Sequence, residues 1–61
     1  MRATKNPISD KEYIQLIVDG GKANEEIYFY NPFYYSVEEV EDYAKIKYKN
    51  RDILVFQECY N

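Results

Sequence analysis

The sequence of 61 residues contains no histidine and a single cysteine, Cys59. One cysteine cannot form a disulfide within the chain, and without histidine or a second cysteine there is no Cys/His metal site. The commonest general base of enzymes is also missing. Glu58 cannot readily activate Cys59, because neighbouring strand residues point to opposite faces. We therefore interpret Cys59 as a small, partly buried apolar side chain. The sequence predicts a protein that is not an enzyme and uses no cofactor and no metal.

Long apolar runs and a strong charge of one sign are absent as well. No segment approaches the roughly 20 apolar residues that a membrane span needs, and no charged-then-apolar leader opens the chain. The net charge of -3 does not suit a general nucleic-acid-binding protein, which needs a basic face. These features predict a cytoplasmic protein that has no membrane partner and for which nucleic acid is a disfavoured partner.

The length of the chain predicts a single domain, residues 1–61, in which residues 1–10 form an extended N-terminal arm. A chain of this length buries only about 60% of the surface that its unfolded form exposes. Small domains often supplement the core with disulfides, metals or self-association. Because the first two are excluded here, we expect self-association.

Two strands and a turn are predicted in the first half of the chain. Residues 12–18 alternate, with Ile14, Leu16 and Val18 on one face. Residues 19–22 contain two glycines and are typical of a turn. Residues 26–30 form the second strand, and the two strands are expected to pair as an antiparallel hairpin.

A helix and a third strand are predicted in the second half. Asn31 and Pro32 end the second strand, and Ser36 with Glu39 forms a capping box. The helix is expected over residues 37–49, with Asn50 as a left-handed residue at its end. Its apolar stripe is Val37, Val40, Ala44 and either Lys47 or Tyr48. Residues 52–58 form the third strand, whose continuous apolar run suggests burial on both faces.

The element order β-β-α-β predicts a small α+β domain, a three-stranded sheet with one helix on one face. The third strand can lie beside the second, or beside the first in an all-antiparallel sheet, and we favour the latter. Ile27 and Phe29 are assigned to the helix face. The opposite face is expected to be covered in a homodimer, because exposing it would forgo several kcal/mol of burial. The expected dimer residues are Tyr13, Ile17, Tyr28 and Tyr30. Pairing of edge strands is a second route to a dimer.

Residues 27–35 hold six of the eleven aromatic residues. Three interpretations are open: core plus dimer interface, a contact surface for another protein, or a platform on which single-stranded nucleic acid stacks. The acidic pair Glu25 and Glu26 opposes the third. Consecutive loop residues cannot all point inward, so the loop is a candidate contact surface, although Phe33 or Tyr35 could instead staple the helix.

Acidic residues at the start of the helix extend this candidate surface. They also complement the helix dipole and form a solvated capping face, which we favour over a metal site, a catalytic pair or a mimic of nucleic acid. The candidate partner-binding residues are Phe33, Tyr34, Tyr35, Glu38, Glu41 and Asp42.

The sequence therefore suggests a small non-enzymatic protein that binds another protein. Its expected role is a homodimeric inhibitor of a host enzyme, such as a phage-encoded anti-defence protein. The alternatives are a nucleic-acid-associated regulator that uses an aromatic sheet face, and a structural subunit of a larger complex.

Overall fold

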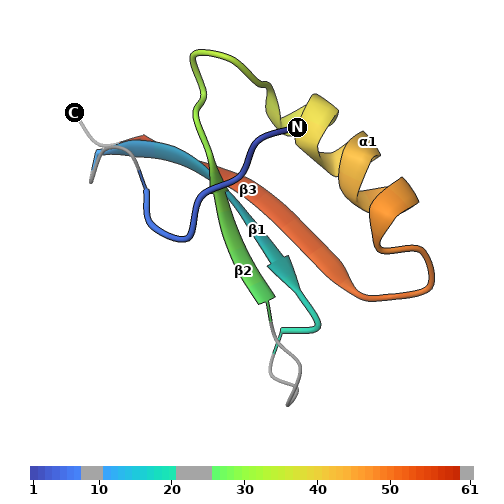
Figure 1. Cartoon of the computed structure of the whole chain (residues 1–61). Coiled ribbons are helices and arrows are strands. Elements are labelled where there is room, and N and C mark those ends of the chain that lie inside the picture. Colours follow the sequence, from blue (N-terminus) through green and yellow to red (C-terminus); the bar gives the residue numbers. More distant parts are fainter. Residues whose placement is uncertain (8–10, 21–25, 60–61) are drawn as a thin grey trace.

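Strand β1 (Glu12–Val18) is the central strand of a three-stranded antiparallel sheet, with β2 (Glu26–Tyr30) on one side and β3 (Ile53–Cys59) on the other. The computed structural model describes residues 1–7, 11–20 and 26–59. One helix, α1 (Val37–Lys47), packs on one face of the sheet (Figure 1). The α+β fold and the sheet order favoured from the sequence are both confirmed, as are the bounds of β1 and β2.

The register of the hairpin decides which side chains face the helix. Leu16 lies opposite Tyr28 in β2 and opposite Val55 in β3, and Ile14 lies opposite Tyr30. Residues directly opposite in a sheet share a face, so Tyr28 and Tyr30 lie on the helix side. The assignment of Ile27 and Phe29 to that side is therefore wrong. Both pairs are apolar enough to be buried, so the alternation within β2 did not indicate which pair faces inward.

The core lies between the helix and this face of the sheet. Its fully buried side chains come from β1 and from the helix, and Tyr30 and Tyr48 complete it. Tyr28, Tyr35, Val37, Ile53 and Val55 pack around it while partly exposed. The core residues are Ile14, Leu16, Val18, Tyr30, Val40, Ala44 and Tyr48.

The helix starts as predicted and ends earlier. The Ser36 side chain accepts from the backbone N–H of Glu39, and the Glu39 carboxylate accepts from the N–H of Ser36, both at 3.2 Å. Lys47 is the last helical residue, and Tyr48 donates its N–H to the carbonyl of Ala44 at 2.8 Å. Asn50 then adopts a φ of 68°, the left-handed conformation expected for it. Tyr48, rather than Lys47, completes the apolar stripe.

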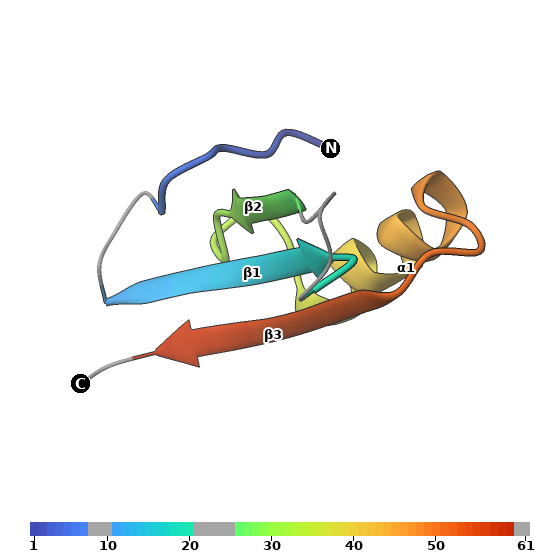
Figure 2. The ribbon, with the colours of Figure 1, turned by 90° about the horizontal axis from the view of Figure 1, so that it is seen from below.

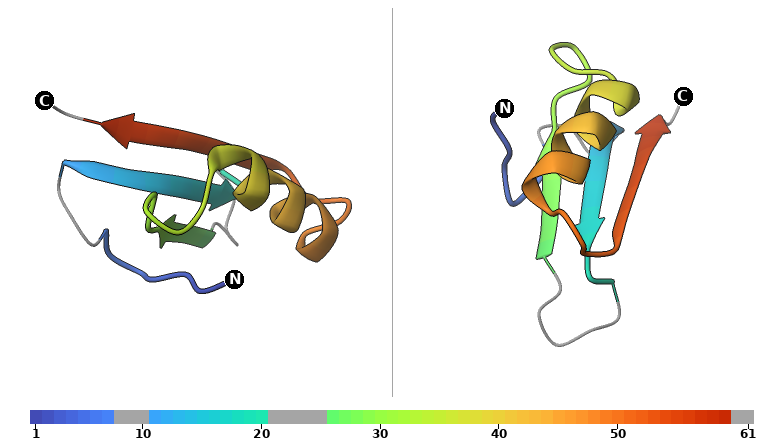
Figure 3. Two further views of the ribbon diagram at one scale, coloured as in Figure 1. Left: turned by 90° about the horizontal axis from the view of Figure 1, so that it is seen from above. Right: turned by 90° about the vertical axis from the view of Figure 1, so that its right-hand side faces the viewer.

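Strand β3 begins and ends one residue later than predicted, and its apolar run is not buried on both faces. Leu54 is 56% exposed, whereas Ile53 and Val55 pack against the core. One helix covers only one face of the sheet (Figure 3). The side chains of β3 that point away from the helix therefore lie on the open face of the sheet.

The N-terminal arm lies along the outer edge of β2 (Figure 2). Thr4 and Phe29 exchange two backbone hydrogen bonds, each 2.9 Å long. Residues 8–10 of the predicted arm, and residues 21 and 22 of the predicted turn, lie outside the described residues. In the described part of that turn, Asp19 has a φ of 55°. Among the described residues, no helix has the length and apolar character required to span a bilayer.

Candidate protein-contact surface

The connection between β2 and the helix is a turn held by Asn31. Its backbone carbonyl accepts from the N–H of Tyr34 at 3.0 Å and from that of Tyr35 at 3.1 Å. Its side-chain oxygen accepts from the N–H of Phe33 at 2.9 Å. Asparagine favours turns because its short side chain bonds the backbone two residues on. Three hydrogen bonds to one residue therefore fix the backbone that carries the aromatic side chains.

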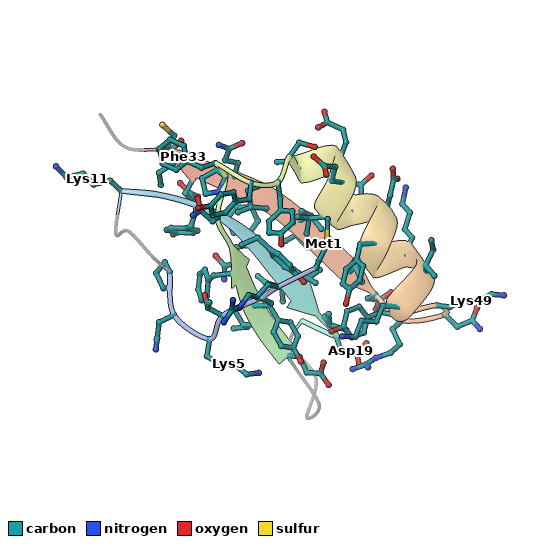
Figure 4. The ribbon with its side chains drawn as sticks, turned by 45° about the horizontal axis from the view of Figure 1, so that its top comes forward. Met1, Lys5, Lys11, Asp19, Phe33 and Lys49 are labelled. Atoms are coloured by element: carbon teal, nitrogen blue, oxygen red, sulfur yellow. The ribbon has the colours of Figure 1, made fainter. Side chains whose placement is uncertain are left out.

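Two aromatic side chains on this turn point into solvent. Phe33 is 85% exposed and Tyr34 is 76% exposed. Figure 4 shows Phe33 at the end of the molecule opposite Lys49, which follows the end of the helix. We call Phe33 and Tyr34 the aromatic tip. Large aromatic side chains with this much exposed apolar area are typical of contact surfaces.

Tyr35 is placed differently from its two neighbours. Its ring meets the buried ring of Tyr30 edge-on, with centroids 5.8 Å apart and planes at 88°. Its hydroxyl oxygen accepts a hydrogen bond from the backbone N–H of Arg2 at 3.1 Å. Tyr35 therefore joins the turn to the core and to the arm, and of the three predicted loop residues only the aromatic tip is free to reach a partner.

A pocket of about 330 Å³ lies beside the aromatic tip. It is formed where the arm, the outer edge of β2 and the turn meet, and Tyr34 belongs to both the tip and the pocket wall. Aromatic residues and Arg2 contribute to this wall. Its lining residues are Arg2, Thr4, Phe29, Asn31, Tyr34 and Tyr35.

The acidic residues predicted to extend the surface lie in the first half of the helix, directly after the turn. Glu38 and Asp42 are exposed and, four residues apart, share a helix face. Glu41 instead pairs with Lys45, with Nζ to Oε1 at 3.2 Å. Glu38 and Asp42 therefore carry negative charge after the turn, together with the exposed capping residue Glu39, and part of the charge of Glu41 is balanced.

The sheet face away from the helix carries half of the predicted dimer residues. Tyr13 and Ile17 lie on it, whereas Tyr28 and Tyr30 do not, and Tyr30 is only 4% exposed. The predicted placement of Tyr28 and Tyr30 on the uncovered face is therefore wrong. The ring of Tyr13 meets that of Phe29 edge-on at 5.3 Å. The apolar residues of this open face are Tyr13, Ile17, Ile27, Phe29, Leu54 and Phe56.

A polar cluster closes the opposite end of the sheet. The Arg51 guanidinium donates to the Asp19 carboxylate through Nε at 2.8 Å and lies 3.6 Å from Glu26. Glu26 also accepts from the Tyr28 hydroxyl at 2.9 Å. These contacts raise the pKa of the Arg51 guanidinium, chiefly through Asp19, and that of Tyr28, chiefly through Glu26. Arg51 also lies over the ring of Tyr48, at 5.4 Å from its centroid.

This cluster was not predicted from the sequence. Asp19 follows β1, Glu26 and Tyr28 belong to β2, and Tyr48 and Arg51 lie between the helix and β3, so these residues meet only once the sheet has formed. Every charged group in it has a partner of opposite sign, which indicates a role in holding the elements together.

Ile46, which lies outside the predicted apolar stripe, is 81% exposed on the outward face of the helix. Cys59 is exposed and carries a free thiol, so its assignment as partly buried is wrong, because it is the last residue of an edge strand. Over the part of the chain that the structure describes, no three His, Cys, Asp or Glu side chains are grouped to hold a metal ion.

Comparison of the chain with protein-family models, with curated proteins and with solved structures gave no significant match.

Proposed function

We propose that this protein is a non-enzymatic, homodimeric protein that acts by binding another protein through its aromatic tip. The observation that carries the proposal is the exposure of Phe33 (85%) and Tyr34 (76%) on a turn whose backbone is fixed by Asn31. Binding orders flexible side chains and loops at a free-energy cost. A turn that is already held by hydrogen bonds lowers that cost, and aromatic side chains supply large contact area with few rotatable bonds.

The charge beside the tip indicates the kind of partner surface. Glu38 and Asp42 are exposed on the helix that follows the turn. A complementary surface would offer an apolar recess for the two rings and basic residues around it, because opposite potentials across an interface favour encounter and orientation. We propose that such binding inhibits the partner by covering a functional surface.

The category that suits a small acidic inhibitor of this kind is a phage-encoded blocker of a host enzyme involved in defence. A reducing compartment such as the cytoplasm suits a chain with one exposed free thiol. Self-association is supported by the open sheet face, where Leu54 is 56% exposed beside further apolar side chains.

Affinity capture from a bacterial lysate with the tagged protein tests the proposal. The test compares the wild-type chain, the double variant Phe33→Ala/Tyr34→Ala and the matched control Ile46→Ala, which removes an equally exposed apolar side chain from the helix. We expect a stoichiometric protein that survives nuclease treatment, is retained by the control and is lost from the double variant.

Two results would count against the proposal. Capture that the double variant retains in full would place the contact elsewhere than the aromatic tip. Capture that disappears after nuclease treatment would indicate that nucleic acid, rather than protein, is the ligand.

A further inference from the structure

The two edges of the sheet are treated differently. The outer edge of β2 is partly covered by the arm, where Thr4 takes both backbone hydrogen bonds of Phe29. No described segment lies along the outer side of β3, which is the outermost element on its side in Figure 2 and in the right-hand view of Figure 3. Exposed edge strands tend to pair with further strands unless something protects them.

Strand β3 carries little of the usual protection, a single charged residue, Glu58, near its end. It is seven residues long and pairs with β1 over its whole length without interruption. Natural edge strands are commonly short, bulged, or interrupted by proline or lysine, and Ile53–Cys59 contains neither proline nor lysine. Its first five residues, ILVFQ, are uncharged.

The hydrogen-bond pattern identifies the backbone groups that the free edge offers. The carbonyl of Asp52 accepts from the N–H of Asp19 at 2.9 Å and so points toward β1. Backbone direction alternates along an antiparallel strand, so the N–H and C=O groups of every second residue from Ile53 point away from β1. These outward residues are Ile53, Val55, Gln57 and Cys59.

A second copy of the chain fits this edge. We propose that two copies pair β3 with β3 antiparallel about a two-fold axis at Phe56, which joins two three-stranded sheets into one of about six strands. This inference rests on the self-association proposed above. The full-length register matches Ile53 with Cys59 and Val55 with Gln57 of the second copy, which uses every outward backbone group of the strand and forms about eight hydrogen bonds.

The side chains support this register. Phe56 lies opposite Phe56 of the second copy in a non-hydrogen-bonded pair, where side chains approach closest. Glu58 lies opposite Leu54, so no like charges meet. Moving the two-fold axis to Val55 would bring Asp52 opposite Glu58 of the second copy, and like charges directly opposite are destabilising. Moving it to Gln57 instead shortens the pairing and so forms fewer hydrogen bonds between the copies.

The paired sheets would also join their open faces. Leu54 and Phe56 lie at the edge of the open face next to the two-fold axis, so the apolar side chains of the two copies become neighbours. An edge alone buries less than the roughly 800 Å² per partner of a standard interface. We therefore expect a dissociation constant in the micromolar range.

Cysteine cross-linking tests the register directly. In a Cys59→Ser background, Phe56→Cys places one thiol beside the equivalent thiol of the second copy at the two-fold axis. The two Cα atoms are then about 4.5 Å apart, which is within the range for a disulfide. Leu54→Cys in the same background is the matched control, because the equivalent residue of the second copy lies about 13 Å away along the strand. We expect a covalent dimer from Phe56→Cys under oxidising conditions and none from Leu54→Cys.

Sedimentation provides a second measurement that does not alter Phe56. Gln57→Pro removes an N–H that points away from β1, a position where edge strands tolerate proline, so it blocks pairing between copies and spares the pairing with β1. At roughly 0.2 mM, well above a micromolar dissociation constant, we expect the wild-type chain and Gln57→Ala to sediment as dimers and Gln57→Pro as a monomer.

The outcomes separate this inference from the proposed self-association. A wild-type chain with the mass of one copy at that concentration would overturn both. A dimer that persists in Gln57→Pro and gives no Phe56→Cys cross-link would overturn the β3 pairing alone, because self-association would then use another surface. Loss of partner capture in the aromatic-tip variant tests the contact with another protein, and it does not test self-association or the pairing of β3.

Discussion

Residues only three positions apart in the aromatic segment have opposite roles. Tyr30 is 4% exposed and belongs to the core, whereas Phe33 is 85% exposed. Tyr35 returns to the core and packs edge-on against Tyr30. The segment is therefore neither wholly core nor wholly contact surface, because the turn at Asn31 directs two of its side chains outward between two that point inward.

The titration of Tyr30 provides a prediction at this scale. Burial raises the pKa of Tyr30 to about 12 from its ordinary value of 10.0, and the nearby Tyr43 and Tyr48 add to the rise. Between these pH values the unfolded state has lost the proton that the folded state keeps. The contribution of Tyr30 to the free energy of unfolding is therefore complete below pH 10 and falls as pH rises toward 12. We expect a loss of about 2 kcal/mol in the free energy of unfolding across this window.

Urea unfolding at pH 8, 10 and 11.5 checks this expectation, with Tyr30→Phe as the control. Phenylalanine fills the same space and cannot ionise, so its free energy of unfolding is expected to fall less steeply over the same range. Equal slopes for the two proteins would show that Tyr30 ionises as readily in the folded state as in the unfolded state.

At the scale of elements, the start of the helix depends on its capping box. Ser36→Ala removes the oxygen that accepts from the N–H of Glu39 and leaves a donor of the first turn without its partner. We expect the free energy of unfolding to fall by about 1 kcal/mol. Chemical denaturation measures the change. Ser36→Thr, which keeps a hydroxyl, is expected to recover most of the loss, and an equal loss in both variants would contradict a role for the cap.

The sequence was sufficient to predict elements where one local signal dominated. Alternation marked β1, and Ser36 with Glu39 marked the start of the helix. The positive φ expected at Asn50 is present as well. The sheet order followed because Leu16, Ile17 and Val18 suit a central strand better than an edge.

The faces of the outer strands depended on information that the local sequence does not hold. In β2 both alternate sets, Ile27 with Phe29 and Tyr28 with Tyr30, are apolar, so only the pairing of Leu16 with Tyr28 decides which faces the helix. Burial of β3 was overestimated because a run of apolar residues has the same pattern in a strand that is buried on both faces and in an edge strand that is covered on one face.

The candidate site was predicted only in part, for the same reason. The aromatic tip was found because consecutive loop residues cannot all point inward. Tyr35 could not be separated from it, because its contacts with Tyr30 and Arg2 are distant in the sequence. The Arg51 cluster was missed because its carboxylate partners belong to other elements.

At the scale of the whole molecule, stability rests on few buried side chains. A domain of this length is expected to have a free energy of unfolding of roughly 3–9 kcal/mol. Leu16 is fully buried on the central strand, and Leu→Ala at such a site costs about 2–5 kcal/mol. We therefore expect Leu16→Ala to lose most or all of its folded structure at 25 °C.

Circular dichroism during heating checks this expectation. Ile46→Ala, which removes an exposed side chain of similar size, is expected to change the free energy of unfolding by no more than about 0.5 kcal/mol. A cooperative transition near the wild-type temperature in Leu16→Ala would show that the described core is not the one that stabilises the protein.

The molecule as a whole is polarised along the sheet. Asp19, which pairs with Arg51, lies at one end, and the aromatic tip with Phe33 projects from the other (Figure 4). One end is held together by paired charges, and the other exposes aromatic rings. This arrangement suits a protein in which one set of residues stabilises the fold and another set binds a partner.

Urea unfolding of Phe33→Ala/Tyr34→Ala against the wild-type chain tests that separation most directly. If the aromatic tip serves a partner and not the fold, the free energy of unfolding changes by no more than about 0.5 kcal/mol, as for other surface substitutions. A loss of about 2 kcal/mol or more, in the range of a buried aromatic side chain, would show that the two rings pack within the folded protein or its dimer and would contradict the account.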